Sequence, residues 1–496
     1  MNHKASNKGL NRKTIFLVIY QGFAARYLLR SDILKELKKH FERIVIISPN
    51  ADEAYFKKEF IDENVSIEKL EIEKYKEYLK KSKGQSFFKK VRWFVLNGKY
   101  QFKSVDDHYK LFLEENNTGD IKSRLIIFFI DKLVMTLRRS KMLRRFFLWI
   151  ECKLFNPAIH YDLFEKYNPD LIITTSLGNV GEGFDLFIMR EAKKYGIRIL
   201  TIILSWDNTS GKGMGGAVPD YIITWTDIMK KELIEYHDYP AHKIFVGGVS
   251  HFDIYYQKDK LLNWGELCSR FGFSPHRKLL FFGTKSPTAC SWNMDIVDII
   301  AKSINEKRLL FDCQLVVRIH PLYYTIKNGV RRHANALEEI EKINGKYPHV
   351  YFNYPCILSD SLGFDMPADE MIILASLLKH SSVVINSFST IALESCICDI
   401  PTINVAFEGY GVKERTKLRH NINYERNWDH FQRLMNYGAI RNVLNEEDLI
   451  KQINVYLENP MLDREKRQKV VEYECGPFNG FAGSTIGDYI IKLVEK

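Results

Sequence analysis

The residues best suited to chemistry in this sequence stand at the ends of short apolar runs. Arg318 lies in the run 314–319, and His320 and Pro321 follow it directly. Proline lacks a backbone donor and restricts the residue before it, so it would end a strand and hold His320 extended at the mouth of a sheet. Ligands bind at such strand ends, where Arg318 could bind a phosphate through two parallel hydrogen bonds. The alternative is that His320 bonds only to neighbouring backbone.

A hydroxyl-rich turn follows the apolar run 383–386 and precedes a predicted helix at 390–398. Its hydroxyl residues are Ser387, Ser389 and Thr390. Hydroxyls and free backbone N–H groups at the start of a helix bind phosphate, although a plain helix cap uses the same residue types. Glu394 lies one helical turn beyond Thr390 and could accept hydrogen bonds from ribose hydroxyls. Together with the His-Pro strand in the same half of the chain, this turn favours a nucleotide site.

Three more polar residues follow apolar runs. Lys285, just after the run 279–283, could bind a diphosphate. Asp207 and Glu182 lie in loops after predicted strands, so either carboxylate could face the hydroxyl of an acceptor and take its proton. For both carboxylates, capping of a helix is the alternative role.

The elements that must position these residues are parallel strands. Continuous apolar runs are typical of parallel strands that are buried on both faces. The runs are 14–20, 43–48, 171–175, 198–204, 221–225 and 244–246, followed by 279–283, 314–319, 350–353, 383–386 and 402–405. Helical or loop sequence separates them, which predicts doubly wound α/β sheets. Because the pattern restarts after Gly247 and Gly248, we predict an α/β fold with two Rossmann-like domains facing a cleft. The expected units are residues 1–255, residues 256–480, and a C-terminal helix within 481–496.

A basic segment interrupts the first predicted domain. The chain has a formal net charge of +11, and residues 74–153 contain 20 Lys/Arg against 8 Asp/Glu, so the rest is nearly neutral. We predict a helical insertion at 74–155. Its basic cluster is Arg138, Arg139, Lys141, Arg144 and Arg145. Apolar residues interleave with the cluster at helical spacing: Leu133, Leu137, Leu143, Phe146, Phe147 and Ile150. Such a helix suits the surface of an anionic membrane, and packing onto the first domain with solvated charges is the alternative.

The composition excludes several classes of protein. Hydrophobic residues make up 46% of the chain and charged residues 27%, which excludes wholesale disorder. The eight cysteines form no Cys-x-x-Cys pair, so we expect reduced thiols and no metal site. There is no apolar stretch of about 18 residues and no secretory signal, so we expect a cytoplasmic protein, bound peripherally to the inner face of the membrane.

The His-Pro element, the Ser-Phe-Ser-Thr turn and the downstream glutamate resemble the donor-binding half of GT-B transferases of bacterial surface polysaccharides. Similar patterns occur in glycerophosphotransferases that use CDP-glycerol and in sialyl- and Kdo-transferases that use CMP-sugars. The resemblance implies that the nucleotide's phosphates are held by His320, Pro321, Ser387, Ser389 and Thr390. The segments 205–208 and 247–253 also resemble surface-carbohydrate biosynthesis proteins.

The sequence departs from these patterns at two points. Asn386 stands where the glycerophosphotransferases usually have an aspartate, and the acidic pair of the sialyltransferases is only half present, as Glu182 before Gly183. The donor can therefore be CMP-, CDP- or UDP-linked. The chain also lacks the Asp-x-Asp motif typical of metal-dependent sugar transferases, so we expect neither metal nor cofactor.

The resemblance and the residues together predict a transferase that moves a sugar or a glycerophosphate from a nucleotide-activated donor to a polysaccharide or lipid-linked acceptor. The expected catalytic residues are Asp207, Glu182 and His320. The expected donor-binding residues are Arg318, His320, Ser387, Ser389, Thr390, Glu394 and Lys285. One alternative is a UDP-sugar 2-epimerase of the same fold, which would leave the basic insertion unexplained. Another is a non-enzymatic protein that binds a membrane or RNA through the insertion, although the transferase hypothesis involves no nucleic acid.

Overall fold

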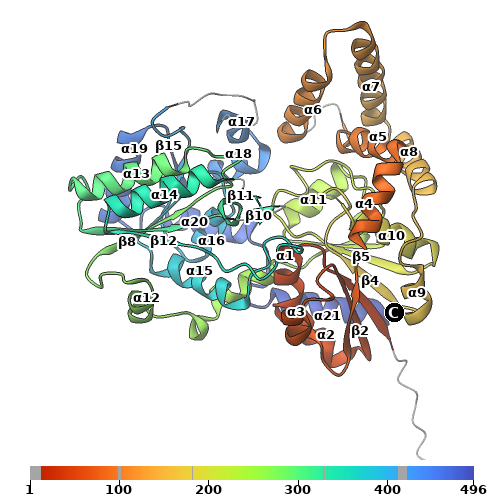
Figure 1. Ribbon diagram of the computed structural model, residues 1–496, viewed down its shortest axis with the longest axis horizontal. Helices are drawn as coiled ribbons and strands as arrows, with labels where there is room; N and C mark the ends of the chain where they lie inside the picture. Colours follow the sequence, from red (N-terminus) through yellow and green to blue (C-terminus); the bar gives the residue numbers. More distant parts are fainter. Residues whose placement is uncertain are drawn as a thin grey trace, which may run out of the picture.

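The computed structural model describes residues 13–98, 102–180, 183–324, 326–327, 330–331, 333–411 and 422–495. Two parallel β-sheets form the centres of two α/β halves that lie side by side (Figure 1). The predicted fold class is therefore confirmed.

The first sheet has seven strands in the order β3-β2-β1-β4-β5-β6-β7. The strands are β1 (Thr14–Val18), β2 (Arg43–Ser48), β3 (Val65–Lys69), β4 (Leu171–Thr174), β5 (Arg198–Ile202), β6 (Tyr221–Thr224) and β7 (Ile244–Val246). Residues 15–18 of the central strand β1 are completely buried, as expected for a continuous apolar run covered on both faces. Helices α3 (Ala54–Phe60), α9 (Tyr161–Tyr167), α10 (Asp185–Lys194) and α11 (Asp227–Glu235) connect the strands.

The segment after β1 consists of three short helical pieces. These are α1 (Gly22–Ala24), a π-helical turn η1 (Ala25–Leu29) and α2 (Asp32–His40). The Ser31 hydroxyl accepts a hydrogen bond from the backbone N–H of Ile33, so it caps α2 and ends the π-turn. π-Turns are found frequently at functional sites, and this one faces the second half of the molecule.

The basic insertion is helical, as predicted. Its helices are α4 (Ile72–Lys81), α5 (Lys83–Trp93), α6 (Lys103–Asn116), α7 (Ile121–Arg139) and α8 (Lys141–Leu154). Figure 1 shows α6 and α7 standing out from the body of the molecule. The inner faces of these helices share a small apolar core of their own around Val91, Phe94 and Val134. Among the described residues, no helix is both long enough and apolar enough to cross a membrane.

The second sheet has six strands in the order β12-β9-β8-β13-β14-β15. The strands are β8 (Lys278–Gly283), β9 (Cys313–Arg318), β12 (Val350–Asn353), β13 (Val383–Asn386), β14 (Thr402–Val405) and β15 (Ile440–Val443). A separate pair of short strands, β10 (Ile326–Lys327) and β11 (Val330–Arg331), is antiparallel. The helices are α12 (Trp264–Phe271), α13 (Asn293–Asn305), α14 (Ala334–Lys346), α15 (Ala368–His380), α16 (Ile391–Ile397), α17 (Ile422–Arg426), α18 (Asp429–Asn436), α19 (Glu446–Glu458) and α20 (Arg464–Glu474).

The last helix, α21 (Ala482–Glu495), returns to the first half and packs against α2. Glycine permits this close approach, because a Cβ on Gly487 would lie 2.8 Å from the Cβ of Glu36. The carboxylate of Asp253 accepts hydrogen bonds from the backbone N–H groups of Ala482 and Gly483, at 3.1 and 2.8 Å, so it fixes the start of the helix. The C-terminal helix is thus part of the cover of the first sheet.

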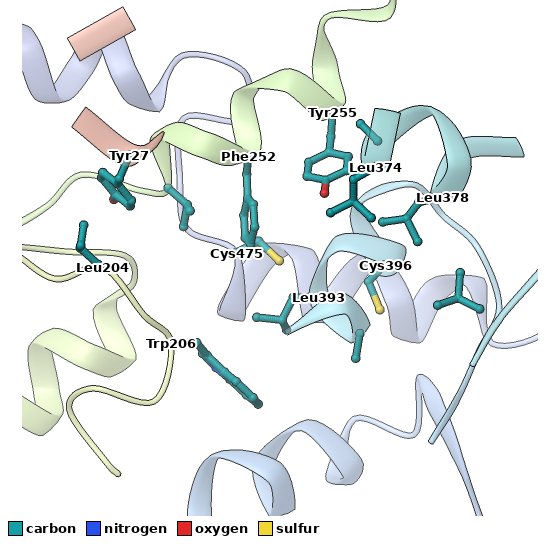
Figure 2. Packing of buried hydrophobic residues seen from close by; sticks show 14 of the residues in the cluster. Tyr27, Leu204, Trp206, Phe252, Tyr255, Leu374, Leu378, Leu393, Cys396 and Cys475 are labelled. Atoms are coloured by element: carbon teal, nitrogen blue, oxygen red, sulfur yellow. The ribbon is translucent and has the colours of Figure 1, made fainter. Parts of the chain in front are cut away.

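The two halves share one continuous apolar core. The short 3₁₀ segments η3 (Ser250–Tyr256) and η4 (Lys258–Lys260) lie between β7 and α12 and link the halves, whereas η2 (Ala241–Lys243) precedes β7 within the first half. Figure 2 shows Tyr27 from the first half, Phe252 and Tyr255 from η3, and Leu374 and Leu393 from the second half within this core. All eight cysteines are free thiols, and most of them are buried.

Candidate functional site

A cavity of about 240 Å³ lies between the two halves, at the carboxyl ends of the second sheet. Its lining includes Arg318, His320, Ser389, Thr390 and Glu394, which come from the ends of β9 and β13 and from α16. From the first half come Phe23, Arg26, Ser205, Trp225 and His251. Five of the residues that the sequence selects therefore line a single cavity, although they are up to 76 positions apart in the chain.

His320 is held at the mouth of β9 by two hydrogen bonds. Its backbone N–H donates to the hydroxyl of Thr284 at 2.8 Å, and its Nδ1 accepts from the N–H of Leu322 at 3.2 Å. Burial lowers the pKa of His320 to about 4, so the ring is neutral at pH 7. Because Nδ1 is the acceptor, Nε2 carries the proton and can donate to a ligand. The residue bonds to local backbone and also faces the cavity.

Arg318 lines the cavity but is engaged by neighbouring side chains. One terminal nitrogen donates to Glu370 Oε2 at 2.7 Å, and the other donates to the side-chain oxygen of Asn353. Glu370 also accepts from the backbone N–H of Cys356, so the buried ion pair is fully supported. These two bonds hold the guanidinium of Arg318 in place in the wall of the cavity, where it contributes positive charge and keeps further N–H donors.

The hydroxyl turn is fixed by two asparagines. Asn404 Oδ1 accepts from the N–H of Phe388 at 2.7 Å, and Asn386 Oδ1 accepts from the N–H of Ser389 at 3.3 Å. These bonds hold Phe388 in a left-handed conformation, with φ of 46°. Ser389 and Thr390 consequently face the cavity, whereas Ser387 is buried beside it and does not line it.

Three buried polar atoms of the residues that line the cavity find no hydrogen-bond partner among the described residues. They are Nε of Arg26, Nδ1 of His251 and Oε2 of Glu394. Burial raises the pKa of Glu394 to about 7, although the positive charge of Arg26 opposes this shift. Burial also places the pKa of His251 well below its usual value, so the ring is neutral. Native proteins satisfy most buried polar atoms, so three orphans around one cavity are typical of a site that a ligand completes.

Asp207 lies beside the cavity, next to the lining residue Ser205. Its Oδ1 accepts from the Ser205 hydroxyl at 2.6 Å, and Lys212 lies 3.4 Å from its Oδ2. Burial disfavours the charged carboxylate, but Lys212 and Ser205 outweigh burial and lower the pKa of Asp207 to about 2. A carboxylate with so low a pKa is a weak general base near neutral pH.

Of the two remaining predicted residues, Lys285 does not line the cavity. Lys285 forms an ion pair with Glu425 of α17. Glu182 lies outside the described residues. The charged lining residues that the sequence did not assign to the site are Arg26 and Glu370. Arg26 closely follows Gly22 after the first strand, but nothing in its local pattern distinguishes it, because it reaches the cavity only through the packing of the two halves.

The loop 355–367, which we call the strap, reaches from the second half to the first. Asp365 of the strap accepts hydrogen bonds from Arg30 at 2.6 Å and from the hydroxyl of Tyr55 at 2.7 Å. The N–H of Gly22 donates to the carbonyl of Leu362 at 2.7 Å. A Cβ on Gly22 would lie 2.3 Å from the backbone nitrogen of Asp365, so only glycine permits this approach. The ring of Phe364 packs edge-on to His320, and the strap therefore covers the cavity.

Solved structures of other proteins share this architecture. MnaA of S. aureus, in a structure with UDP, aligns with a TM-score of 0.52 and 10% identity over 97% of both chains. A Listeria monocytogenes protein, whose proposed activity is that of a UDP-N-acetylglucosamine 2-epimerase, aligns with a TM-score of 0.52 and 13% identity, covering 98% of this chain and 97% of that one. The wall teichoic acid polymerase TagF aligns with a TM-score of 0.45 and 11% identity, covering 98% of this chain and 89% of that one.

The chain has the GT-B fold. At these identities the likeness concerns the fold alone. No model of a protein family matches the chain, and no curated protein matches it either. In this GT-B chain, no group of three or more His, Cys, Asp or Glu side chains among the described residues could hold a metal ion. The positive charges near the cavity are those of Arg26 and Arg318.

Proposed function

We propose that the chain is a transferase that moves a sugar or a glycerophosphate from a nucleotide-activated donor to a surface-polysaccharide or lipid-linked acceptor. The cavity with three unpartnered buried atoms carries this proposal, because it combines neutral donors, hydroxyls and a carboxyl group at the carboxyl ends of parallel strands. In the proposed complex the second half holds the nucleotide and the first half faces the acceptor.

Each residue of the cavity has a role in this proposal. His320 Nε2 and the hydroxyls of Ser389 and Thr390 hold the phosphates and stabilise the negative charge of the leaving nucleotide. Glu394 accepts hydrogen bonds from the ribose hydroxyls, and Arg26 approaches the phosphates from the opposite wall. Asp207 or Glu182 receives the proton of the acceptor hydroxyl. Asp207 would have to lose the influence of Lys212 to do so, because that lysine lowers its basicity.

A UDP-sugar 2-epimerase is the second candidate, because the GT-B neighbours with the higher TM-scores include proteins with that description. The insertion favours the transferase. An epimerase acts on a soluble donor alone, and it has no use for helices that expose apolar and basic side chains.

Incubation with CDP-glycerol, a CMP-activated sugar and UDP-N-acetylglucosamine separates the two functions. A transferase slowly hydrolyses its own donor without an acceptor, and the freed nucleotide is measured by chromatography. An epimerase changes the configuration at C2 of the sugar, which proton NMR detects, whereas a transferase leaves C2 unchanged. Nucleotide release from one donor supports the transferase, and C2 inversion without release refutes it.

In the proposed function the insertion binds the surface of an anionic membrane, and the structure corrects which residues can do so. Arg144 is buried and pairs with Asp238 at 2.7 Å, and Arg138 is buried and pairs with Asp106 at 3.1 Å. The predicted interleaved apolar residues mostly face the core of the insertion, with Phe146 the exposed exception. The predicted cluster of five basic residues is therefore wrong in part, because charge and spacing do not reveal buried partners.

A different set of side chains forms the exposed docking surface of α7 and α8. Its apolar members are Ile121, Leu125, Ile126, Phe128, Phe129, Met142, Phe146 and Trp149. Its exposed basic members are Lys122, Arg124, Arg139, Lys141 and Arg145. Mixed apolar and basic side chains complement the interface of an anionic bilayer, and each basic residue contributes about 1 kcal/mol there.

Co-sedimentation with phosphatidylglycerol-rich vesicles tests this surface. We expect binding at low salt that weakens at high salt, because the attraction is screened. The variant with Arg139, Lys141 and Arg145 changed to Gln should lose most of the binding. A matched control changes Lys342, Lys451 and Lys469, which are exposed on the second half, to Gln. Equal binding by the two variants would exclude docking through α7 and α8.

A further inference from the structure

A second cavity lies in the first half, between α8 and α10 and away from the cleft. Its volume of about 740 Å³ exceeds that of the cleft cavity, and it falls within the range of roughly 300–1,000 Å³ that is typical of small-molecule sites. Leu148, Met189, Ile199 and Ala217 line it and are buried apolar residues. Because Ile199 belongs to β5, the cavity reaches down to the central sheet.

The mouth of this cavity is aromatic and basic. Trp149 lines it, is half exposed, and stacks on Phe146 with ring centroids 5.9 Å apart. Val218 lines the opposite side and is also exposed. The exposed basic lining residues are Arg145, Lys153, Lys193 and Lys194, and the buried Arg190 lines the cavity as well. The cavity therefore opens directly beside the docking surface of α8.

The positive charge at the mouth is only partly neutralised. Lys193 pairs with Asp220 at 2.8 Å. The nearby Glu151 is buried and is neutralised by Arg92 and Arg190, at 2.9 and 2.8 Å. Within the described part of the chain, no carboxylate pairs with Arg145 or Lys153. An anion at the mouth would thus meet uncompensated cationic side chains.

One buried polar atom of the lining also lacks a partner. Asn156 donates from its amide nitrogen to the carbonyl of Arg190 at 3.2 Å, while its Oδ1 is buried and bonds to no described residue. An amide oxygen in this state can accept a hydrogen bond from a hydroxyl group of a ligand. The apolar floor and the cationic mouth are complementary to a molecule with a hydrocarbon chain and an anionic head.

We propose that this cavity binds the hydrocarbon chain of an anionic amphiphile, a lipid phosphate or a fatty carboxylate, whose head lies against Arg145 and Lys153. The biological role of this binding rests on the proposed function, because a lipid-linked acceptor carries a hydrocarbon chain. The docking surface would bring the cavity to the bilayer that holds such an acceptor. The binding itself is independent of the cleft and of the transfer reaction.

Calorimetric titration of the full chain with dodecyl phosphate, below its micelle concentration, tests the binding. We expect one saturable site, weaker binding of octyl phosphate because fewer methylenes are buried, and no binding of inorganic phosphate. Dodecanoate in place of dodecyl phosphate distinguishes the two kinds of head group, and tight binding of either one supports the site. Dodecyl maltoside, with the same chain and a neutral head, should bind more weakly.

Two variants locate the site. Val218→Trp fills the mouth and should weaken dodecyl phosphate by about tenfold or more, since the chain can no longer reach the floor. Its control is Ile234→Trp, at a comparably exposed aliphatic residue on α11. Arg145→Gln with Lys153→Gln should weaken dodecyl phosphate by about tenfold but leave dodecyl maltoside unchanged. Lys451→Gln with Lys469→Gln is the control for that pair.

Several results would overturn the inference. Absence of saturable binding by the wild type would do so, and so would equal affinity of Val218→Trp and Ile234→Trp. Dimerisation of the wild type in sedimentation equilibrium, abolished by Val218→Trp, would show that a second copy occupies the cavity instead. Titration of the same samples with nucleotide distinguishes failure of the amphiphile site from failure of the proposed transferase function. The Val218→Trp protein should bind nucleotide normally even if the amphiphile site is absent.

Discussion

The ion pair between the strap and the first half gives a sharp prediction about how the cleft is covered. Asp365 is fully buried, and its carboxylate accepts from both Arg30 and Tyr55. We predict that Asp365→Ala releases the strap without unfolding either half. The affected contact includes the hydrogen bond from the N–H of Gly22 to the carbonyl of Leu362, which bridges the two halves.

The expected magnitude follows from the partners that remain. Removal of one member of a buried ion pair costs about 3–5 kcal/mol, mostly because the other charge is left uncompensated. Arg30 also pairs with Glu59 at 2.7 Å, so its charge keeps a partner in Asp365→Ala. The cost should thus lie near the lower end, about 3 kcal/mol, which corresponds to about a 10²-fold larger population of the open strap.

Hydrogen exchange measures this population at the right place. The amide of Gly22 should exchange about 10²-fold faster in Asp365→Ala than in the wild type, because it is protected only while the strap is closed. Amides of the buried strand β1 report global stability and should keep their protection. Asp360→Ala is the control, because Asp360 is exposed in the same loop.

Two outcomes would refute this reasoning. If exchange at Gly22 does not change in Asp365→Ala, the ion pair does not hold the strap. If the Gly22 and β1 amides accelerate together, the residue supports the whole fold and the strap has no separate opening. A Gly22→Ala variant gives an independent check, since its Cβ would collide with the strap backbone and should accelerate opening even with Asp365 intact.

Three further predictions concern the cleft. His320→Ala should reduce donor turnover by about 10²–10³-fold with little change in folding, measured by nucleotide release and circular dichroism, and near-normal turnover would remove the residue from the mechanism. Ser389→Ala with Thr390→Ala should weaken binding of the free nucleotide in calorimetry, and an unchanged affinity would reduce the turn to a structural role. The raised pKa of Glu394, about 7, means that the folded chain holds this proton more tightly than the unfolded chain does. The stability that this proton adds to the folded chain is therefore fully present below pH 4.5 and is lost as the pH rises to 7. Over this interval the free energy of unfolding of the wild type should fall by about 3 kcal/mol relative to that of Glu394→Gln, as measured in urea titrations. Parallel pH profiles of the two proteins would contradict the shift.

Most of the strands that the sequence predicts have side chains buried on both faces, and β7 and β12 are the partly buried exceptions. Within the two parallel sheets, two described strands have no counterpart in the predicted set, and both lie at an edge: β3 (Val65–Lys69) and β15 (Ile440–Val443). The short antiparallel strands β10 and β11 have no predicted counterpart either. β3 alternates between apolar and polar residues, β15 has two polar residues between two apolar ones, and both strands are only partly buried. These two strands lack a continuous apolar run, so the rule that finds central parallel strands does not detect them, although it does find β7 and β12 at the opposite edges of the two sheets.

The residues of the candidate site also fall into two groups, those that the sequence can bring together and those that it cannot. Residues at the ends of neighbouring strands, such as His320 and Ser389, can be grouped from the sequence because parallel strands share one edge. Arg26 enters the cavity only because the two halves pack together, and no local pattern encodes that packing. For the same reason the sequence does not predict the burial of Arg138 and Arg144, because their partners Asp106 and Asp238 belong to other helices or loops.

The return of α21 to the first half has a consequence for synthesis on the ribosome. The first half includes a helix that is made after the entire second half, because Asp253 and its partner Ala482 are 229 positions apart in the chain. At about 5–20 residues per second, this gap corresponds to roughly 10–45 s of translation. During that time the face of α2 that α21 will cover is open to chaperones and to other nascent chains. The second half can complete its own sheet meanwhile, so the domain that begins folding first is the one that finishes last.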